Sequence, residues 1–144
     1  MTKKSPTILI VEDDEGHALL IRQILEEAGL TNQIHHFHDG QAAVDFFSQR
    51  PAFDHSEAFL VLLDIRMPKL DGIQVLRWLK ADPIFARIPV IMLTTSDDTR
   101  EVERCYELGC NVYIQKPVDY EKFAEAIRRL GQFVSTVLLP EVAA

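Results

Sequence analysis

Several short apolar runs of the sequence end in residues that can do chemistry. Each run is followed at once by a carboxylate, a hydroxyl or an ammonium group. In chain order these residues are Glu12 and Asp13 after residues 7–11, Asp64 after residues 59–63, Thr94 after residues 89–93 and Lys116 after residues 112–115. If the runs are parallel strands, their carboxyl ends share one edge of a sheet, where ligands bind in open α/β folds. We therefore expect these residues to form one site.

Three carboxylates in one site repel each other, and either protons or a divalent cation must relieve this repulsion. Oxygen ligands with open coordination positions suit Mg²⁺, which keeps waters and shares its coordination sphere with phosphate. A Mg²⁺ site beside the ammonium of Lys116 and the hydroxyl of Thr94 is typical of phosphoryl transfer. Asp64 is the predicted nucleophile, since a carboxylate can carry a phosphoryl group covalently.

The elements that must position these residues follow from the hydrophobic pattern. The run Phe59–Leu63 has no polar alternation, which indicates a strand buried on both faces under helices. The other three runs indicate similar strands, and residues 33–37 indicate a weaker one. Helical patterns separate all five strands, which predicts βαβ units. The expected fold is α/β: a flavodoxin-like, doubly wound sheet of five parallel strands in the order 2-1-3-4-5 with five helices.

Local signals predict how the helices begin, end and pack. Asp14 is expected to cap the first helix rather than to bind a ligand. The fourth helix should turn Val102, Cys105 and Tyr106 inward and end at Gly109.

The composition is that of one globular domain. The chain has 144 residues, which suffices for a proper core, and a net charge of −7, which argues against a nucleic-acid-binding surface. No apolar run has the length of a membrane span, and residues 1–6 are unlike a cleavable signal. Cys105 and Cys110 should point to different sides of one helix and stay unpaired, which fits a reducing cytoplasm.

Four motifs resemble the receiver domain of two-component response regulators. They are ILIVEDD at 8–14, LLDIRMPKLDG at 62–72, IMLTTS at 91–96 and YIQKP at 113–117. Together they follow the order and spacing of that family over nearly the whole chain. The resemblance implies a signalling protein that accepts a phosphoryl group and assists its own phosphorylation and dephosphorylation, rather than an enzyme with a separate substrate.

The resemblance also implies a role for each residue of the site. Asp64 would accept the phosphoryl group from a phosphohistidine of a sensor histidine kinase or a phosphotransfer protein. Asp13 would bind Mg²⁺ directly and Glu12 through water, and Asp64 and the backbone carbonyl of Arg66 would complete the protein ligands. Glu12 stands where the family more commonly has Asp, which gives this carboxylate a longer arm. Lys116 would contact the phosphoryl group.

Two residues are implied to form a switch. Thr94 would move toward the phosphoryl group, and Tyr113 would turn inward behind it. A cis peptide bond before Pro117 would help to position Lys116. The residue pattern agrees with separate roles for Lys116 in the chemistry and Tyr113 in the switch. Tyr113 lies three positions before Lys116 and so faces the other side of a strand.

The carboxyl-terminal end favours a stand-alone regulator that forms a homodimer. We predict a receiver domain over residues 1–131, an extension over residues 132–144 and no output domain. Phe133 and residues 137–139 are more apolar than the fold requires and would form an exposed patch. A homodimer through the fourth helix, the fifth helix and the tail would cover it. The long loop at residues 50–58 and the ending FVSTVLLP resemble the response regulators of phytochrome-type histidine kinases.

Three other functions stay open at this point. A metal-dependent phosphatase with an aspartyl nucleophile would need a second acid two residues further on, where this chain has Arg66. A flavin- or nucleotide-binding module of the same fold would want a hydroxyl- or Gly-rich phosphate loop, whereas residues 12–15 are all acidic. A receiver that only binds partners and is never phosphorylated is the third alternative.

Overall fold

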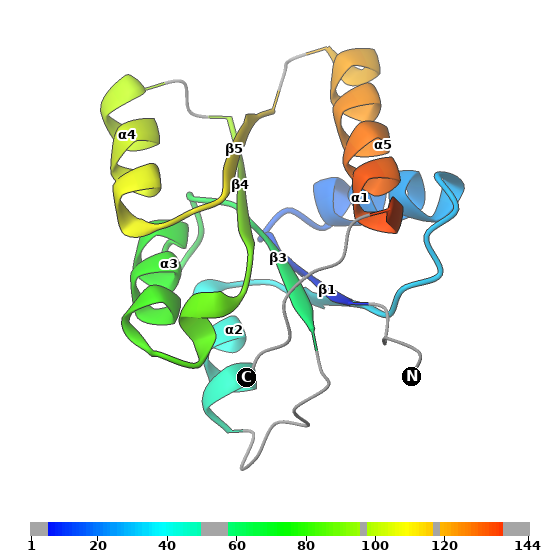
Figure 1. Cartoon of the computed structure of the whole chain (residues 1–144). Coiled ribbons are helices and arrows are strands. Elements are labelled where there is room, and N and C mark those ends of the chain that lie inside the picture. The colour runs from blue at the N-terminus through cyan, green and yellow to red at the C-terminus, as the bar shows by residue number, and fades with distance from the viewer. Residues whose placement is uncertain (1–5, 50–57, 96–97, 117–118, 137–144) are drawn as a thin grey trace.

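Five parallel strands form the central sheet in the computed structural model of this protein (Figure 1). The structure describes residues 6–49, 58–95, 98–116 and 119–136. The strands are β1 (Thr7–Val11), β2 (Ile34–Phe37), β3 (Phe59–Leu63), β4 (Val90–Thr94) and β5 (Val112–Gln115). Their order is β2-β1-β3-β4-β5 and each neighbouring pair is parallel, which confirms the predicted sheet.

Five helices cover the two faces of the sheet. They are α1 (Glu15–Glu27), α2 (Gly40–Ser48), α3 (Gly72–Ala81), α4 (Thr99–Leu108) and α5 (Tyr120–Thr136), with a 3-10 turn η1 (Phe85–Arg87) before β4. In Figure 1, α1 and α5 lie together on one side of the sheet, and α2, α3 and α4 lie on the other. No helix of the described residues is long and apolar enough to cross a membrane.

The central strand β3 is buried on both faces. All five of its residues are buried. Successive side chains of a strand point to opposite faces, so Leu60 and Leu62 pack in the layer of α1 and α5, whereas Val61 and Leu63 pack in the layer of α2, α3 and α4. Each apolar side chain removed from water contributes roughly 25 cal/mol per Å². The unbroken apolar run in the sequence therefore reflects a strand with a helix layer on each side.

Short polar side chains and a glycine set the helix ends. The Asp14 carboxylate accepts a hydrogen bond from the backbone N–H of His17 (3.0 Å), which confirms the predicted cap of α1. Asp71 and Gln74 form a capping box at the start of α3. Gly109 ends α4, as predicted, with a φ of +105°, a conformation that favours glycine.

In two places the structure differs from the prediction. The prediction that Tyr106 faces inward is wrong, because its ring is 49% exposed and its hydroxyl accepts a hydrogen bond from the backbone N–H of Tyr113 (3.1 Å). The turn η1 is the second difference. The sequence does not predict it, because three residues are too few to show a hydrophobic period.

The last helix crosses the predicted domain boundary. α5 continues through Gly131 to Thr136, so the predicted extension begins inside a helix. The boundary at residue 131 stays a prediction.

Candidate functional site

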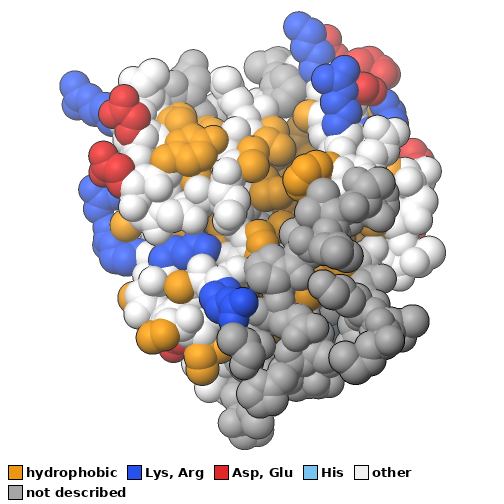
Figure 2. Space-filling model, in the orientation of Figure 1, with side chains coloured by type: hydrophobic (Ala, Val, Ile, Leu, Met, Phe, Trp, Pro, Cys, Tyr) orange, Lys and Arg blue, Asp and Glu red, His pale blue; other side chains and the backbone are white. Residues whose placement is uncertain are grey.

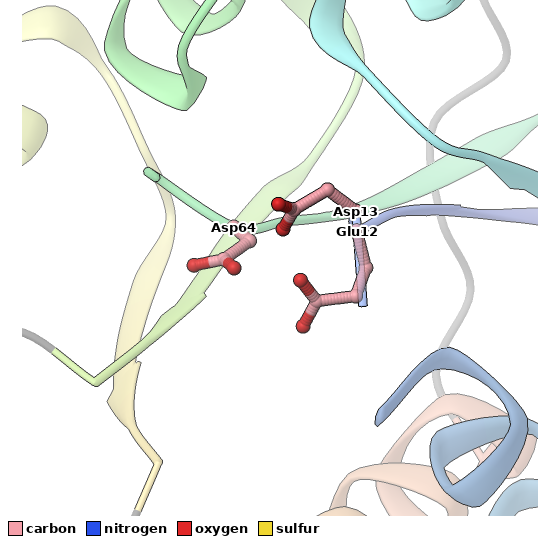
Figure 3. A group of neighbouring side chains, drawn as sticks. All are labelled: Glu12, Asp13 and Asp64. Carbon is pink, nitrogen blue, oxygen red and sulfur yellow. The ribbon is translucent and has the colours of Figure 1, made fainter. Parts of the chain in front are cut away.

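The carboxyl ends of β1 and β3 bring three carboxylates together. These strands are neighbours, with Val11 opposite Leu63, so the residues that follow them lie side by side. The backbone N–H of Asp64 donates to the carbonyl of Val11 (3.0 Å), which extends the pairing one residue beyond the strands. Each of Glu12, Asp13 and Asp64 offers a carboxylate oxygen within 4.8 Å of the others. Figure 3 shows the three side chains gathered at this edge of the sheet.

Lys116 supplies a positive charge to the same site from the end of β5. Its ammonium forms an ion pair with the carboxylate of Glu12 and lies 3.5 Å from Oδ2 of Asp64. The residue is only 7% exposed. Its backbone N–H donates to the carbonyl of Thr94 (2.7 Å), so the strand pairing of β5 with β4 fixes where this lysine enters the site. The structure thus brings Glu12, Asp64 and Lys116 together, and the roles of these residues stay predictions.

Glu12 carries an unusual proton affinity. The residue is 2% exposed, and its burial, followed by a hydrogen bond shared with Asp64, raises its pKa to about 8 although Lys116 acts in the opposite direction. The ammonium of Lys116 therefore does not offset the burial of Glu12 and its contact with Asp64. Asp13 is exposed and Asp64 half-buried, so the site is open on one side. An all-oxygen ligand set with more carboxylates than ammonium groups beside it, reachable from water, fits Mg²⁺.

Two histidines support the site from outside the predicted residues. The Nε2–H of His36 donates to the backbone carbonyl of Glu12 (2.7 Å), and this bond crosses from the edge strand β2 to β1. Nδ1 of His17 lies 3.7 Å from Oε1 of Glu12. The predicted strand order already places β2 beside β1, but the sequence does not show that the side chain of His36 reaches the backbone of Glu12.

The loop after Asp64 is held close to the site by a glycine. The Asp64 carboxylate accepts a hydrogen bond from the backbone N–H of Ile65 (2.8 Å), and the N–H of Gly72 donates to the carbonyl of Ile65 (2.8 Å). A Cβ atom at Gly72 would lie 2.1 Å from the carbonyl oxygen of Asp64, which is far inside van der Waals contact. Only glycine therefore allows α3 to begin so close to the predicted nucleophile.

The remaining predicted residues lie around this centre. Thr94 is fully buried at the end of β4, next to the strand that carries Lys116. Tyr113 is half-buried and packs with the layer of α2, α3 and α4, so it lies away from the carboxylates. Arg66 follows in the loop after β3 with an exposed side chain. The predicted cis bond at Pro117 lies outside the described residues.

Comparison with known proteins identifies the family. Residues 8–128 match the family described as "Response regulator receiver domain". The chain belongs to the response regulator receiver domain family. Response regulator Rcp1 of Synechocystis sp. is 34% identical over 135 residues, which cover 92% of this chain and 92% of Rcp1.

Solved structures support the same assignment. The receiver domain of a response regulator from Rhodospirillum rubrum superposes with a TM-score of 0.89 at 45% identity, covering 96% of this chain and 99% of that one. The Mn²⁺-bound form of Rcp1 gives 0.84 at 32% identity, covering 94% and 99%. The phosphorylated cyanobacterial phytochrome response regulator RcpA gives 0.85 at 29% identity, covering 96% and 100%. The fold and family of this receiver domain therefore agree with the sequence prediction, including its similarity to phytochrome-associated regulators.

Proposed function

We propose that this receiver domain accepts a phosphoryl group on Asp64 from a partner histidine kinase or phosphotransfer protein in a Mg²⁺-dependent reaction. The observation that carries the proposal is the arrangement of Glu12, Asp13, Asp64 and Lys116 at one edge of the sheet. It joins a carboxylate nucleophile, an oxygen-only metal ligand set and a fixed ammonium. RcpA, a relative of similar fold, is described as phosphorylated, which supports the same chemistry here.

In the proposed step, a carboxylate oxygen of Asp64 attacks the phosphorus of a phosphohistidine. The new O–P bond forms as the N–P bond breaks, and the histidine leaves with its electron pair, to be protonated. Lys116 holds its ammonium against the incoming anionic group, which lowers the repulsion with the Asp64 carboxylate. Glu12, Asp13, Asp64 and the backbone carbonyl of Arg66 would hold Mg²⁺, which supplies positive charge to the phosphoryl oxygens when bound. Rcp1, a relative of similar fold, is described in an Mn²⁺-bound form, which supports the binding of a divalent cation by this protein.

We further propose that Thr94 and Tyr113 report the phosphorylation. The hydroxyl of Thr94 would bond to the new phosphoryl group, since Thr94 ends the strand between Asp64 and Lys116. Tyr113 belongs to β5, where Met92 of β4 is its register partner. A movement of Thr94 would therefore reach Tyr113 through two paired strands.

Intact mass spectrometry tests the proposed chemistry. The protein is incubated with acetyl phosphate in Mg²⁺ or in EDTA and then weighed. We expect the gain of one phosphoryl group in Mg²⁺ only, and no gain in Asp64→Asn. Asp45→Asn, which removes an acid of α2, is the matched control and should be labelled like the wild type. A wild type that gains no mass would support instead the alternative that the domain only binds partners.

We also propose that the domain forms a homodimer through α4, β5 and α5. Four large apolar side chains of these elements are well exposed: Tyr106, Val112, Tyr120 and Phe133. Figure 2 shows apolar side chains gathered over β5 between α4 and α5. A second copy that buries them would gain the free energy of apolar burial. The predicted contribution of residues 137–144 lies outside the described residues.

Light scattering tests this assembly. We expect Val112→Glu and the deletion of residues 132–144 each to convert a dimer into a monomer, because both remove apolar contact area. Leu19→Glu is the matched control, since Leu19 is 57% exposed but lies on α1. A dimer that survives both changes, or a wild type that is a monomer with and without phosphorylation, would contradict the proposal.

The cognate kinase is proposed to be of the phytochrome type. The support is the similarity to RcpA, which is described as a phytochrome response regulator, together with a response regulator described in red light signalling of R. palustris at 33% identity. We place the reaction in the cytoplasm, and this location stays a prediction.

A further inference from the structure

Helix α4 is weakly anchored to the rest of the domain. Cys105 is its only fully buried residue, and Val102 and Leu108 are half-buried. Most of its other side chains are charged and exposed. A helix with so little buried apolar area can shift at a small cost in free energy. Any specific bond between α4 and the sheet therefore has a large share in setting the position of this helix.

Tyr106 makes such a bond. Its hydroxyl accepts a hydrogen bond from the backbone N–H of Tyr113 at 3.1 Å. Among the described strands β5 lies at the edge of the sheet and pairs with β4 alone. The hydroxyl of Tyr106 on α4 therefore accepts from a backbone N–H on the side of β5 that faces away from β4. Tyr106 is 49% exposed, so it lies outside the buried core of the domain. The bond thus explains why a large aromatic residue of α4 lies against β5 instead of in the core.

The backbone that Tyr106 contacts leads directly to the site. Gln115 pairs with Thr94, and the next residue, Lys116, donates its N–H to the carbonyl of Thr94 (2.7 Å). Tyr113 lies two residues before Gln115 on the same short strand. β5 has only four residues, so we expect it to move as a rigid unit. A displacement at Thr94 or Lys116 would then also move the backbone N–H of Tyr113, which is bonded to Tyr106.

We propose that Tyr106 is a positioning residue that ties α4 to the backbone of the switch residue Tyr113, so that the phosphorylation state of Asp64 reaches α4 through this bond. The inference rests on the proposed phosphoacceptor function. It goes beyond that function by naming the contact that makes α4 follow β5. It also gives a physical role to the hydroxyl group, as distinct from the aromatic ring.

Tyr106→Phe tests the proposal because it removes the hydroxyl and keeps the ring. Tyr120→Phe is the matched control, since Tyr120 is similarly exposed, at 56%, on α5. Amide exchange by NMR is measured first on the unphosphorylated proteins. Loss of one hydrogen bond should speed exchange of the Tyr113 amide about three- to tenfold. The urea midpoint should change little, and acetyl phosphate with Mg²⁺ should label both variants at the wild-type rate.

The second readout is the response of α4 to phosphorylation. In the wild type and in Tyr120→Phe, labelling should shift the amide resonances of residues 99–108. In Tyr106→Phe these shifts should fall to less than half, while the shifts at Thr94 and Lys116 persist. A full α4 response, or unchanged exchange at Tyr113, in a labelled Tyr106→Phe protein would overturn this inference alone. A wild type that is not labelled would overturn the proposed function and the relay together.

Discussion

Glu12 is the residue of the site whose charge depends most on its surroundings. It is 2% exposed and lies beside Asp64, and its pKa is raised from 4.5 to about 8, mainly by burial. In the folded, metal-free protein the carboxyl group therefore keeps its proton in a pH range where the unfolded chain has released it. The contribution of Glu12 to stability is then fully present below the unfolded pKa and falls as the pH rises from about 4.5 to about 8.

Glu12→Gln should remove this pH dependence, because an amide does not titrate. Between pH 6 and pH 8 the free energy of unfolding of the metal-free wild type should fall by about 1–2 kcal/mol, and that of the variant by much less. Urea unfolding in EDTA measures both. Glu27→Gln changes an exposed acid of α1 and should keep the wild-type slope. Equal slopes for the wild type and Glu12→Gln would contradict the raised pKa.

At the scale of elements, the site depends on how closely α3 approaches the end of β3. The loop between them must return within a few residues so that the first turn of α3 lies against the backbone of Asp64. Gly72 makes this possible because it has no Cβ atom. The same loop contacts α2, where a Cβ at Gly40 would lie 2.2 Å from the carbonyl oxygen of Leu70. Two glycines thus hold the nucleophile loop between two helices.

Gly72→Ala should destabilise the domain by about 2–4 kcal/mol, because the new methyl group overlaps backbone atoms that cannot move aside. Gly16→Ala is the matched control, since the nearest atom to its Cβ is the end of the Asp14 side chain at 3.1 Å. In the first turn of α1 this change should be neutral or slightly stabilising. Thermal unfolding compares the two variants, and equal melting temperatures would show that the loop adapts.

The sequence predicts the elements well and the contacts between them less well. Phe59–Leu63 is identified because a strand covered on both faces leaves an unbroken apolar run. The support of Glu12 by His36 is not, because the strand order places β2 beside β1 but does not show that the imidazole reaches the backbone of Glu12. Tyr106 is assigned wrongly because a helical period reports hydrophobicity and not a hydroxyl that bonds to a strand edge. The ion pair of Glu12 with Lys116 likewise depends on side-chain reach.

At the scale of the whole molecule, the site and the exposed apolar face lie on connected elements. Lys116 ends β5, and Val112 of the same strand belongs to the face formed by α4, β5 and α5. A change of charge at Asp64 would act on Lys116, and a shift of Lys116 would displace β5 and the surface that we propose to bind a second copy. Chemistry at the sheet edge would thus control the proposed dimer surface, which lies only a few residues away along β5.

The central claim is that Asp64, and not a neighbouring acid or histidine, carries the phosphoryl group. Glu12 is paired with Lys116 and Asp13 is exposed, which leaves Asp64 as the carboxylate beside both the ammonium and the open side of the site. Borohydride reduction converts an aspartyl phosphate into homoserine, which tandem mass spectrometry locates in the chain. We expect homoserine at position 64 after treatment with acetyl phosphate and Mg²⁺. Homoserine at position 13, or a phosphoryl group on His17 or His36 with position 64 unchanged, would contradict it.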